Sequence, residues 1–152
     1  MSWYSIALFV HVVGALLLFA LLALEGFTLR TGTGTTAARL NRVLGPISAL
    51  AILVPGIYMV VVAAGWTGWA AVGLVTYVLI AGIGAYTGIS VLRGRMSPRA
   101  ATISWLVRTG MALGVVFDMT VKPDRLWSVV AVAVGVALAL VALPAVRTTR
   151  TT

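Results

Sequence analysis

The sequence predicts an all-α membrane protein, a bundle of five transmembrane helices. Of its 152 residues, 61% are hydrophobic and 9% are charged, and the mean hydropathy is +1.11. A soluble protein carries about 25% charged residues, so this composition excludes an ordinary soluble enzyme or a disordered tail. The apolar residues form continuous runs rather than alternating ones, which favours helices over a membrane β-barrel. The chain has no cysteine, which excludes a disulfide-stabilised module.

Five apolar runs are long enough to be membrane spans. A helix needs about 20 apolar residues to cross about 30 Å of hydrocarbon. We expect spans at residues 4–29, 45–64, 69–92, 101–121 and 126–146, in a single domain covering residues 1–152. The first run lacks the basic segment of a secretory signal peptide and is too long for one, so we expect it to remain as a span.

The connections between the runs differ in length and character. Residues 65–68 join the second and third spans, and residues 122–125 join the fourth and fifth, so both pairs should be antiparallel hairpins. Pro123 cannot continue a helix and ends the fourth span. Residues 30–41, rich in threonine and glycine, predict a flexible polar linker. Within the second span, Pro55 followed by Gly56 predicts a kink.

Basic residues in the loops predict the orientation of the bundle. One side has two, Lys122 and Arg125, whereas the other side has eight: Arg30, Arg39, Arg42, Arg93, Arg95, Arg99, Arg147 and Arg150. The positive-inside rule then places the N-terminus outside and the C-terminus in the cytoplasm. The net charge of +8 therefore indicates topology, because a nucleic-acid site would gather its cations on one solvated face. The abundance of arginine, alanine, valine and glycine favours a bacterial cytoplasmic (inner) membrane.

Small residues spaced by four predict close helix contacts. Helices in lipid approach each other most closely where side chains are small. Such pairs are Gly84 with Gly88 and Gly110 with Gly114, and the fifth span has a similar row, Ala131, Gly135 and Ala139. We expect these residues to pack the bundle internally. Self-association into a homo-oligomer, or contact with a partner in a membrane complex, is the alternative.

Five ionisable residues lie within or at the edge of the predicted spans: His11, Glu25, Arg108, Asp118 and Lys122. Each charge at depth costs about 3 kcal/mol or more, so such residues need partners. Residues fourteen apart on a helix differ by only about 40° in direction, which puts His11 and Glu25 on one face and Arg108 and Lys122 on another. Depth then predicts two pairs, Glu25 with Arg108 and His11 with Asp118.

Each of these groups has a structural and a functional interpretation. Glu25 and Arg108 form either an ion pair that joins two helices or part of a transport path, and Lys122 anchors the interface or serves the path. Asp118 either pairs with Lys122 one turn later or binds a proton. His11 is a hydrogen-bonded membrane histidine, a proton relay with Asp118, or a ligand to haem or copper. Methionines could assist such a ligand: Met59, Met111 and Met119. With no second histidine and no cysteine, we predict no cofactor.

The sequence contains no catalytic constellation, since no serine–histidine–acid set and no HExxH motif is present. We therefore expect a non-enzymatic accessory, assembly or oligomer-forming component of the membrane. The first alternative is a minimal proton-linked transporter or permeation pathway through His11, Asp118 and Lys122. The second alternative is a haem- or copper-handling protein based on His11.

Three stretches resemble a known family: LFVHVVGALLLFALLALEG at 8–26, VPGIYM at 54–59 and VRTGMALGVVFDMTVKPD at 107–124. They are similar to small bacterial integral membrane proteins of unknown function, themselves distantly similar to copper-resistance D-type membrane proteins, which place a histidine in a first-helix H-x-x-G context. The resemblance implies no reaction. It marks the following residues: His11, Gly14, Pro55, Gly56, Arg108, Lys122 and Pro123. This chain departs from the family in its shorter cytoplasmic loops and in Asp118, where the family has an apolar residue.

Overall fold

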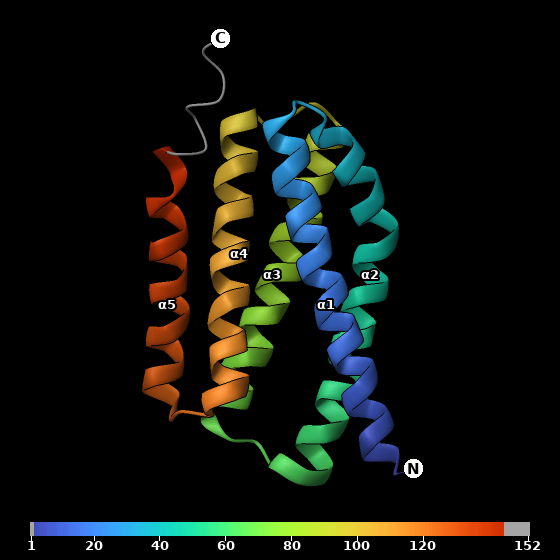
Figure 1. Cartoon of the computed structure of the whole chain (residues 1–152), viewed down its shortest axis with the longest axis vertical. Coiled ribbons are helices and arrows are strands. Elements are labelled where there is room, and N and C mark those ends of the chain that lie inside the picture. Colours follow the sequence, from blue (N-terminus) through green and yellow to red (C-terminus); the bar gives the residue numbers. More distant parts are fainter. Residues whose placement is uncertain (1, 145–152) are drawn as a thin grey trace.

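The computed structural model describes residues 2–144 and is an all-α bundle, as the sequence predicts (Figure 1). Its helices are α1 (Trp3–Arg30), α2 (Gly34–Met59), α3 (Gly68–Leu92), α4 (Pro98–Val121) and α5 (Arg125–Val141), and α2 continues into a π-helical segment, η1 (Val60–Ala64). Four helical segments are long and apolar enough to cross a membrane: α1, α2 with η1, α3 and α4. Large apolar side chains such as Phe9, Val54 and Leu138 are exposed on the bundle, which is typical of a lipid-facing surface.

The last helix is shorter than the sequence predicted. Helix α5 has 17 residues, so it is about 25 Å long and falls short of the hydrocarbon thickness. The end of the predicted span, residues 145–146, lies outside the described residues, as do Arg147 and Arg150 of the charge count.

The predicted flexible linker at residues 30–41 is wrong. Only a short turn, residues 31–33, separates α1 from α2, which begins at Gly34 rather than Gly45. The physical reason is packing, because Ala37 and Ala38 are buried against the bundle and make this segment an ordinary helix. The early start also brings Asn41 into the bundle, where it contacts Glu25.

The two ends of the bundle carry different residues. One end holds the loops 65–67 and 122–124, and we call it the tryptophan end because Trp3, Trp66 and Trp127 lie there. The other end holds the loops 31–33 and 93–97, and we call it the arginine end. Lys122 stops α4 at the tryptophan end in a left-handed conformation (φ 54°), and Asp124 caps α5 by accepting a hydrogen bond from the Trp127 N–H. These two caps produce the tight turn between α4 and α5 that the sequence predicts at Pro123.

Helix α1 does not run parallel to α4. The two helices lie side by side near the arginine end, and α1 leans away toward the tryptophan end, where it follows α2 (Figure 1). At the α1–α2 contact, Ser48 Oγ donates a hydrogen bond to Gly14 O at 3.1 Å, and a Cβ on Gly14 would lie 2.9 Å from Ala51. This divergence determines which polar residues can meet.

The predicted glycine contacts are present between α4 and α5. A Cβ on Gly110 would lie 2.7 Å from the Gly135 carbonyl carbon, and one on Gly114 would lie 2.6 Å from Val132 Cα. These glycines let the two backbones touch, and α5 packs almost entirely on α4.

Candidate functional site

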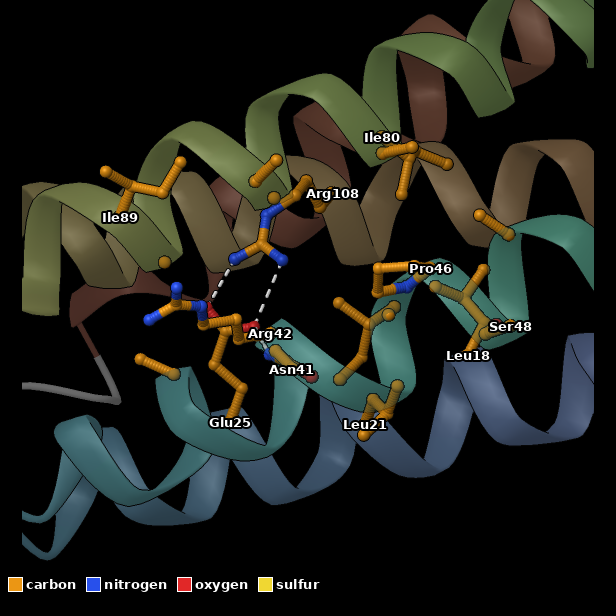
Figure 2. A pocket seen from close by; sticks show the side chains of 18 of the residues that line it. Leu18, Leu21, Glu25, Asn41, Arg42, Pro46, Ser48, Ile80, Ile89 and Arg108 are labelled. Atoms are coloured by element: carbon orange, nitrogen blue, oxygen red, sulfur yellow. Dashed lines mark hydrogen bonds and ion pairs between the residues drawn. The ribbon is translucent and has the colours of Figure 1, made fainter.

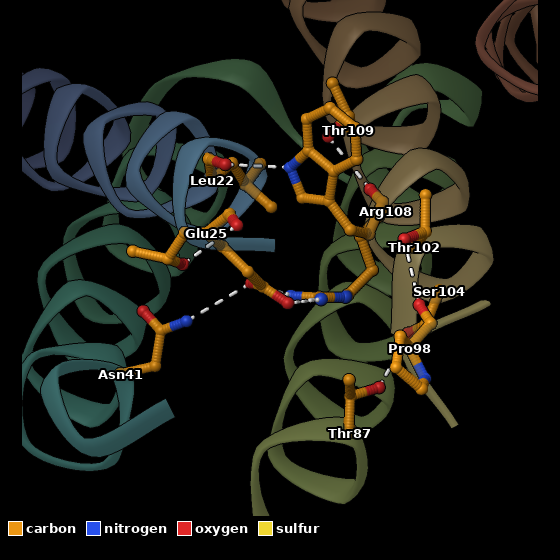
Figure 3. A network of polar contacts seen from close by, with 11 residues as sticks. Leu22, Glu25, Asn41, Thr87, Pro98, Thr102, Ser104, Arg108 and Thr109 are labelled. Atoms are coloured by element: carbon orange, nitrogen blue, oxygen red, sulfur yellow. Dashed lines mark hydrogen bonds and ion pairs between the residues drawn. The ribbon is translucent and has the colours of Figure 1, made fainter. Parts of the chain in front are cut away.

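Glu25 of α1 and Arg108 of α4 form a buried ion pair near the arginine end (Figure 3). Arg108 Nη1 donates to Glu25 Oε2 at 3.0 Å and Nη2 donates to Oε1, so the pairing is bidentate. Asn41 Nδ2 donates to the same Oε2 at 3.2 Å. Both side chains are buried, and this is the only ion pair among residues 2–144. The structure therefore brings together the two residues that the sequence placed at one depth.

Trp105 of α4 contacts α1 beside Glu25, and no sequence signal predicted this contact. Its indole Nε1 donates to Leu22 O at 2.7 Å, and its ring packs on Gly26, where any side chain would collide with it. A Cβ on Gly84 of α3 would lie 3.3 Å from Arg108 Nη1. Gly84 thus leaves room for the guanidinium, while Trp105 ties α4 to α1 next to the ion pair.

A cavity of about 620 Å³, which we call the arginine-side cavity, opens beside the ion pair (Figure 2). Arg108 and Glu25 form part of its wall, and two exposed arginines, Arg42 and Arg93, also line it. The rest of the lining is mostly apolar, with Leu18, Leu21, Leu22 and Ile80 among its residues.

Gly88 lines this cavity and packs on nothing. A Cβ added to Gly88 would meet no atom within 4 Å, and the same holds for Gly45 on the facing helix α2. The predicted packing role of the Gly84–Gly88 pair is therefore wrong for Gly88. The spacing is that of a contact face, but α2 and α3 stand apart here, so the small residues leave space.

A second cavity of about 510 Å³, the tryptophan-side cavity, lies toward the other end. Its lining includes His11 and Lys122, together with Trp66 and Trp69. The Lys122 ammonium lies 5.6 Å from the centre of the Trp69 ring, a cation–π distance. Lys122 is thus held at the edge of this cavity.

His11 is bound to α2 and not to α4. Its Nδ1 lies 2.8 Å from Ile52 O; because a carbonyl only accepts, Nδ1 carries the hydrogen. The ring packs on Gly56, where a Cβ would be 3.2 Å away, so Gly56 gives the ring room. Pro55 is buried, and α2 stays α-helical past it as far as Met59. The chain then changes to the π-helical segment η1.

Asp118 is buried on the side of α4 that packs against α5. Its side chain has no exposed surface, and neither carboxylate oxygen has a hydrogen-bond partner among the described residues. Its polar neighbour is Ser128 of α5, which is equally buried and whose hydroxyl also lacks a partner. Asp118 lines neither of the two cavities.

Both partners predicted for Asp118 are wrong. His11 is out of reach because α1 has leaned away from α4 at this level and follows α2 (Figure 1). Lys122 is one turn later in sequence, but its left-handed backbone ends the helix there, and its side chain stacks on Trp69. The face of α4 that bears Asp118 is covered by α5.

Asp118→Asn is expected to change the free energy of unfolding by no more than about 1 kcal/mol. An ionised carboxylate buried without a cation costs several kcal/mol, whereas asparagine has the same shape and carries no charge. Unfolding in mixed micelles measures the change. A loss above about 3 kcal/mol would show that the folded protein depends on the charge.

The haem or copper hypothesis depends on His11 and the methionines near it. Nowhere in residues 2–144 do three His, Cys, Asp or Glu side chains gather as a metal site would require. His11 with Nδ1–H engaged leaves Nε2 as the lone-pair nitrogen, and Met59 and Met119 line the same cavity, whereas Met111 does not. The soft-ligand set for copper or haem would be His11 with these two thioethers.

The two cavities meet in the middle of the bundle. Three residues line both: Leu18 of α1 and Tyr77 and Ile80 of α3, which we call the shared wall. Tyr77 and Ile80 are buried, and Tyr77 is the polar residue of the shared wall. Ionisable residues lie on both sides of the wall, His11 and Lys122 on one side and the Glu25–Arg108 pair on the other.

The chain was compared with family models, curated proteins and solved structures. The chain matches no family model, no curated protein and no solved structure.

Proposed function

We propose that this chain is a small membrane transport or permeation protein in which a proton-linked solute passes between the two cavities. The observation that carries the proposal is that the cavities share Leu18, Tyr77 and Ile80, so one residue layer separates them. Polar and ionisable groups inside a membrane protein usually mark such pathways. A purely structural accessory protein, the first expectation from sequence, has no need of two cavities that hold charged residues.

The pathway differs from the one that the sequence outlined. Asp118 lines neither cavity, and the polar group that takes its place in the pathway is the Tyr77 phenol of the shared wall. A hydroxyl both donates and accepts a hydrogen bond, so it can pass a proton across a wall that is otherwise apolar. His11 lines the cavity on one side of this wall, and Glu25 lines the cavity on the other side.

The membrane orientation belongs to this proposal. With the arginine end in the cytoplasm of a bacterium, the tryptophan-side cavity faces outward and the arginine-side cavity faces inward. Helix α5 rests on the outside of α4 and lines neither cavity. It completes the five-helix bundle without contributing to the pathway.

Proton flux into liposomes tests the proposal. Vesicles loaded with a pH-sensitive dye and given a potassium diffusion potential are expected to acidify faster with the protein than without it. Tyr77→Phe removes only the hydroxyl of the shared wall and should lower this flux severalfold. The matched control is Tyr86→Phe, on the same helix, because Tyr86 is exposed and lines neither cavity. Flux no higher than in empty vesicles, or equal flux in the two variants, refutes the pathway.

A further inference from the structure

We infer that the arginine-side cavity binds an anionic amphiphile, with its phosphate or carboxylate head at Arg42 and Arg93 and its apolar tail along the cavity toward the shared wall. The inference deepens the proposed function, on which it rests, by naming the class of solute that this cavity takes. Three properties of the cavity support it: unbalanced positive charge, an apolar lining and open space between α2 and α3.

The positive charge at this cavity is not neutralised by the protein. The chain has three acidic residues, and Glu25 alone lines the cavity. Both of its oxygens are occupied by Arg108, and one also by Asn41. The other two acids lie elsewhere, Asp118 under α5 and Asp124 at the tryptophan end. Arg42 and Arg93 therefore remain as two cations without an acidic partner.

These two arginines approach the cavity from facing helices. Arg42 is on α2 and Arg93 directly follows α3, and Figure 2 shows Arg42 beside the Glu25–Arg108 pair. A planar guanidinium binds phosphate or carboxylate with two parallel hydrogen bonds, so each of these arginines offers the cavity a site for an acidic head group. Basic pockets between membrane helices on the cytoplasmic side are known to bind acidic lipid heads.

The remainder of the cavity fits a tail. Its volume of about 620 Å³ is in the range of small-molecule sites, and the lining away from the arginines is mainly leucine, isoleucine, alanine and glycine. Gly45 and Gly88 face open space on opposite sides of it. From Arg93 to Ile80 the cavity follows α3 for about 20 Å, which gives the tail a continuous apolar path.

Binding to the purified, detergent-solubilised protein tests the inference, with four probes compared by native mass spectrometry and thermal stabilisation. Dodecyl phosphate and phosphatidylglycerol are expected to bind, whereas phosphatidylcholine, which carries no net charge, and inorganic phosphate, which has no tail, are expected to bind at least tenfold more weakly. Tighter binding of phosphatidylglycerol than of dodecyl phosphate identifies a lipid as the source, and the reverse order identifies a soluble amphiphile. Equal binding of phosphatidylcholine, or of inorganic phosphate, overturns the inference.

Two pairs of variants locate the site. Arg42→Gln with Arg93→Gln should weaken dodecyl phosphate binding at least tenfold, whereas Arg95→Gln with Arg99→Gln, which removes the same charge from residues that do not line the cavity, should not. Gly88→Leu should project an apolar side chain into the tail path of the cavity and weaken dodecyl phosphate binding at least tenfold. Its control is Gly82→Leu on the same helix, where a Cβ also meets nothing within 4 Å but the residue lies outside the cavity. Equal effects within either pair overturn the site.

The binding assay tests the amphiphile site, and the flux assay tests the pathway, so each can fail while the other succeeds. Flux that is lost in Tyr77→Phe while no amphiphile binds would leave the pathway standing and overturn this inference. Specific binding with no flux would support the amphiphile site and refute transport through the shared wall.

Discussion

Arg108→Leu is expected to destabilise the bundle by about 3–5 kcal/mol, the usual cost of removing one partner of a buried ion pair. The substitution leaves the Glu25 carboxylate buried, with only Asn41 as a hydrogen-bond donor. It also removes the one charged contact between α1 and α4. The free energy of unfolding, measured by SDS titration in mixed micelles, reports the effect.

A double variant separates the cost of the orphaned charge from that of lost packing. Glu25→Leu with Arg108→Leu removes both charges, so it should recover a large part of the loss, because an apolar pair in this position leaves no charge without a partner. Arg99→Leu, an exposed arginine of the same helix, is the control and should change stability by no more than about 0.5 kcal/mol. A single variant as stable as the unmodified protein would contradict the ion-pair interpretation.

Gly110→Leu is expected to separate α5 from α4 and to cost about 3 kcal/mol or more, the upper range for overpacking. Any side chain here collides with the backbone of Gly135 and Val136, which cannot yield as a flexible side chain can. Gly82→Leu is the matched control, because a Cβ at Gly82 faces open space.

Separation of α5 has a direct readout as well as a stability change. The chain has no cysteine, so Ser128→Cys introduces a single thiol at a fully buried position of α5. In the Gly110→Leu background this thiol should react with maleimide within minutes, whereas in the otherwise unmodified chain it should stay protected. A protected thiol in both backgrounds would show that the α4–α5 contact tolerates the larger side chain.

The fold and the ion pair were predictable because their signals are local. A continuous apolar run of spanning length specifies a helix in a membrane, and a charge inside such a run demands a partner. Glu25 and Arg108 have the same depth and opposite charge, so the sequence alone could pair them. The glycines of α4 were predictable for a similar reason, since Gly110 and Gly114 lie on one face of one helix.

The other pairings were not predictable because they depend on how the helices cross. His11 and Asp118 have the same depth, but α1 leans toward α2. His11 therefore contacts α2, whereas Asp118 is covered by α5. Gly88 has the spacing of a contact residue, but only the separation of α2 from α3 decides that it faces a cavity. Trp105 gave no signal, since an indole that bonds to a helix carbonyl looks in sequence like any other interfacial tryptophan.

The sequence by itself determined a bundle of apolar helices suited to a membrane, the approximate position of each helix except the start of α2, and the pairing of Glu25 with Arg108. The tertiary structure alone decided which polar groups meet, that two cavities share one wall, and that Arg42 and Arg93 are left without acids. The physical reason is that depth and helical face follow from a fixed rise and twist per residue, whereas the tilt of one helix against another is set by packing of all its side chains together.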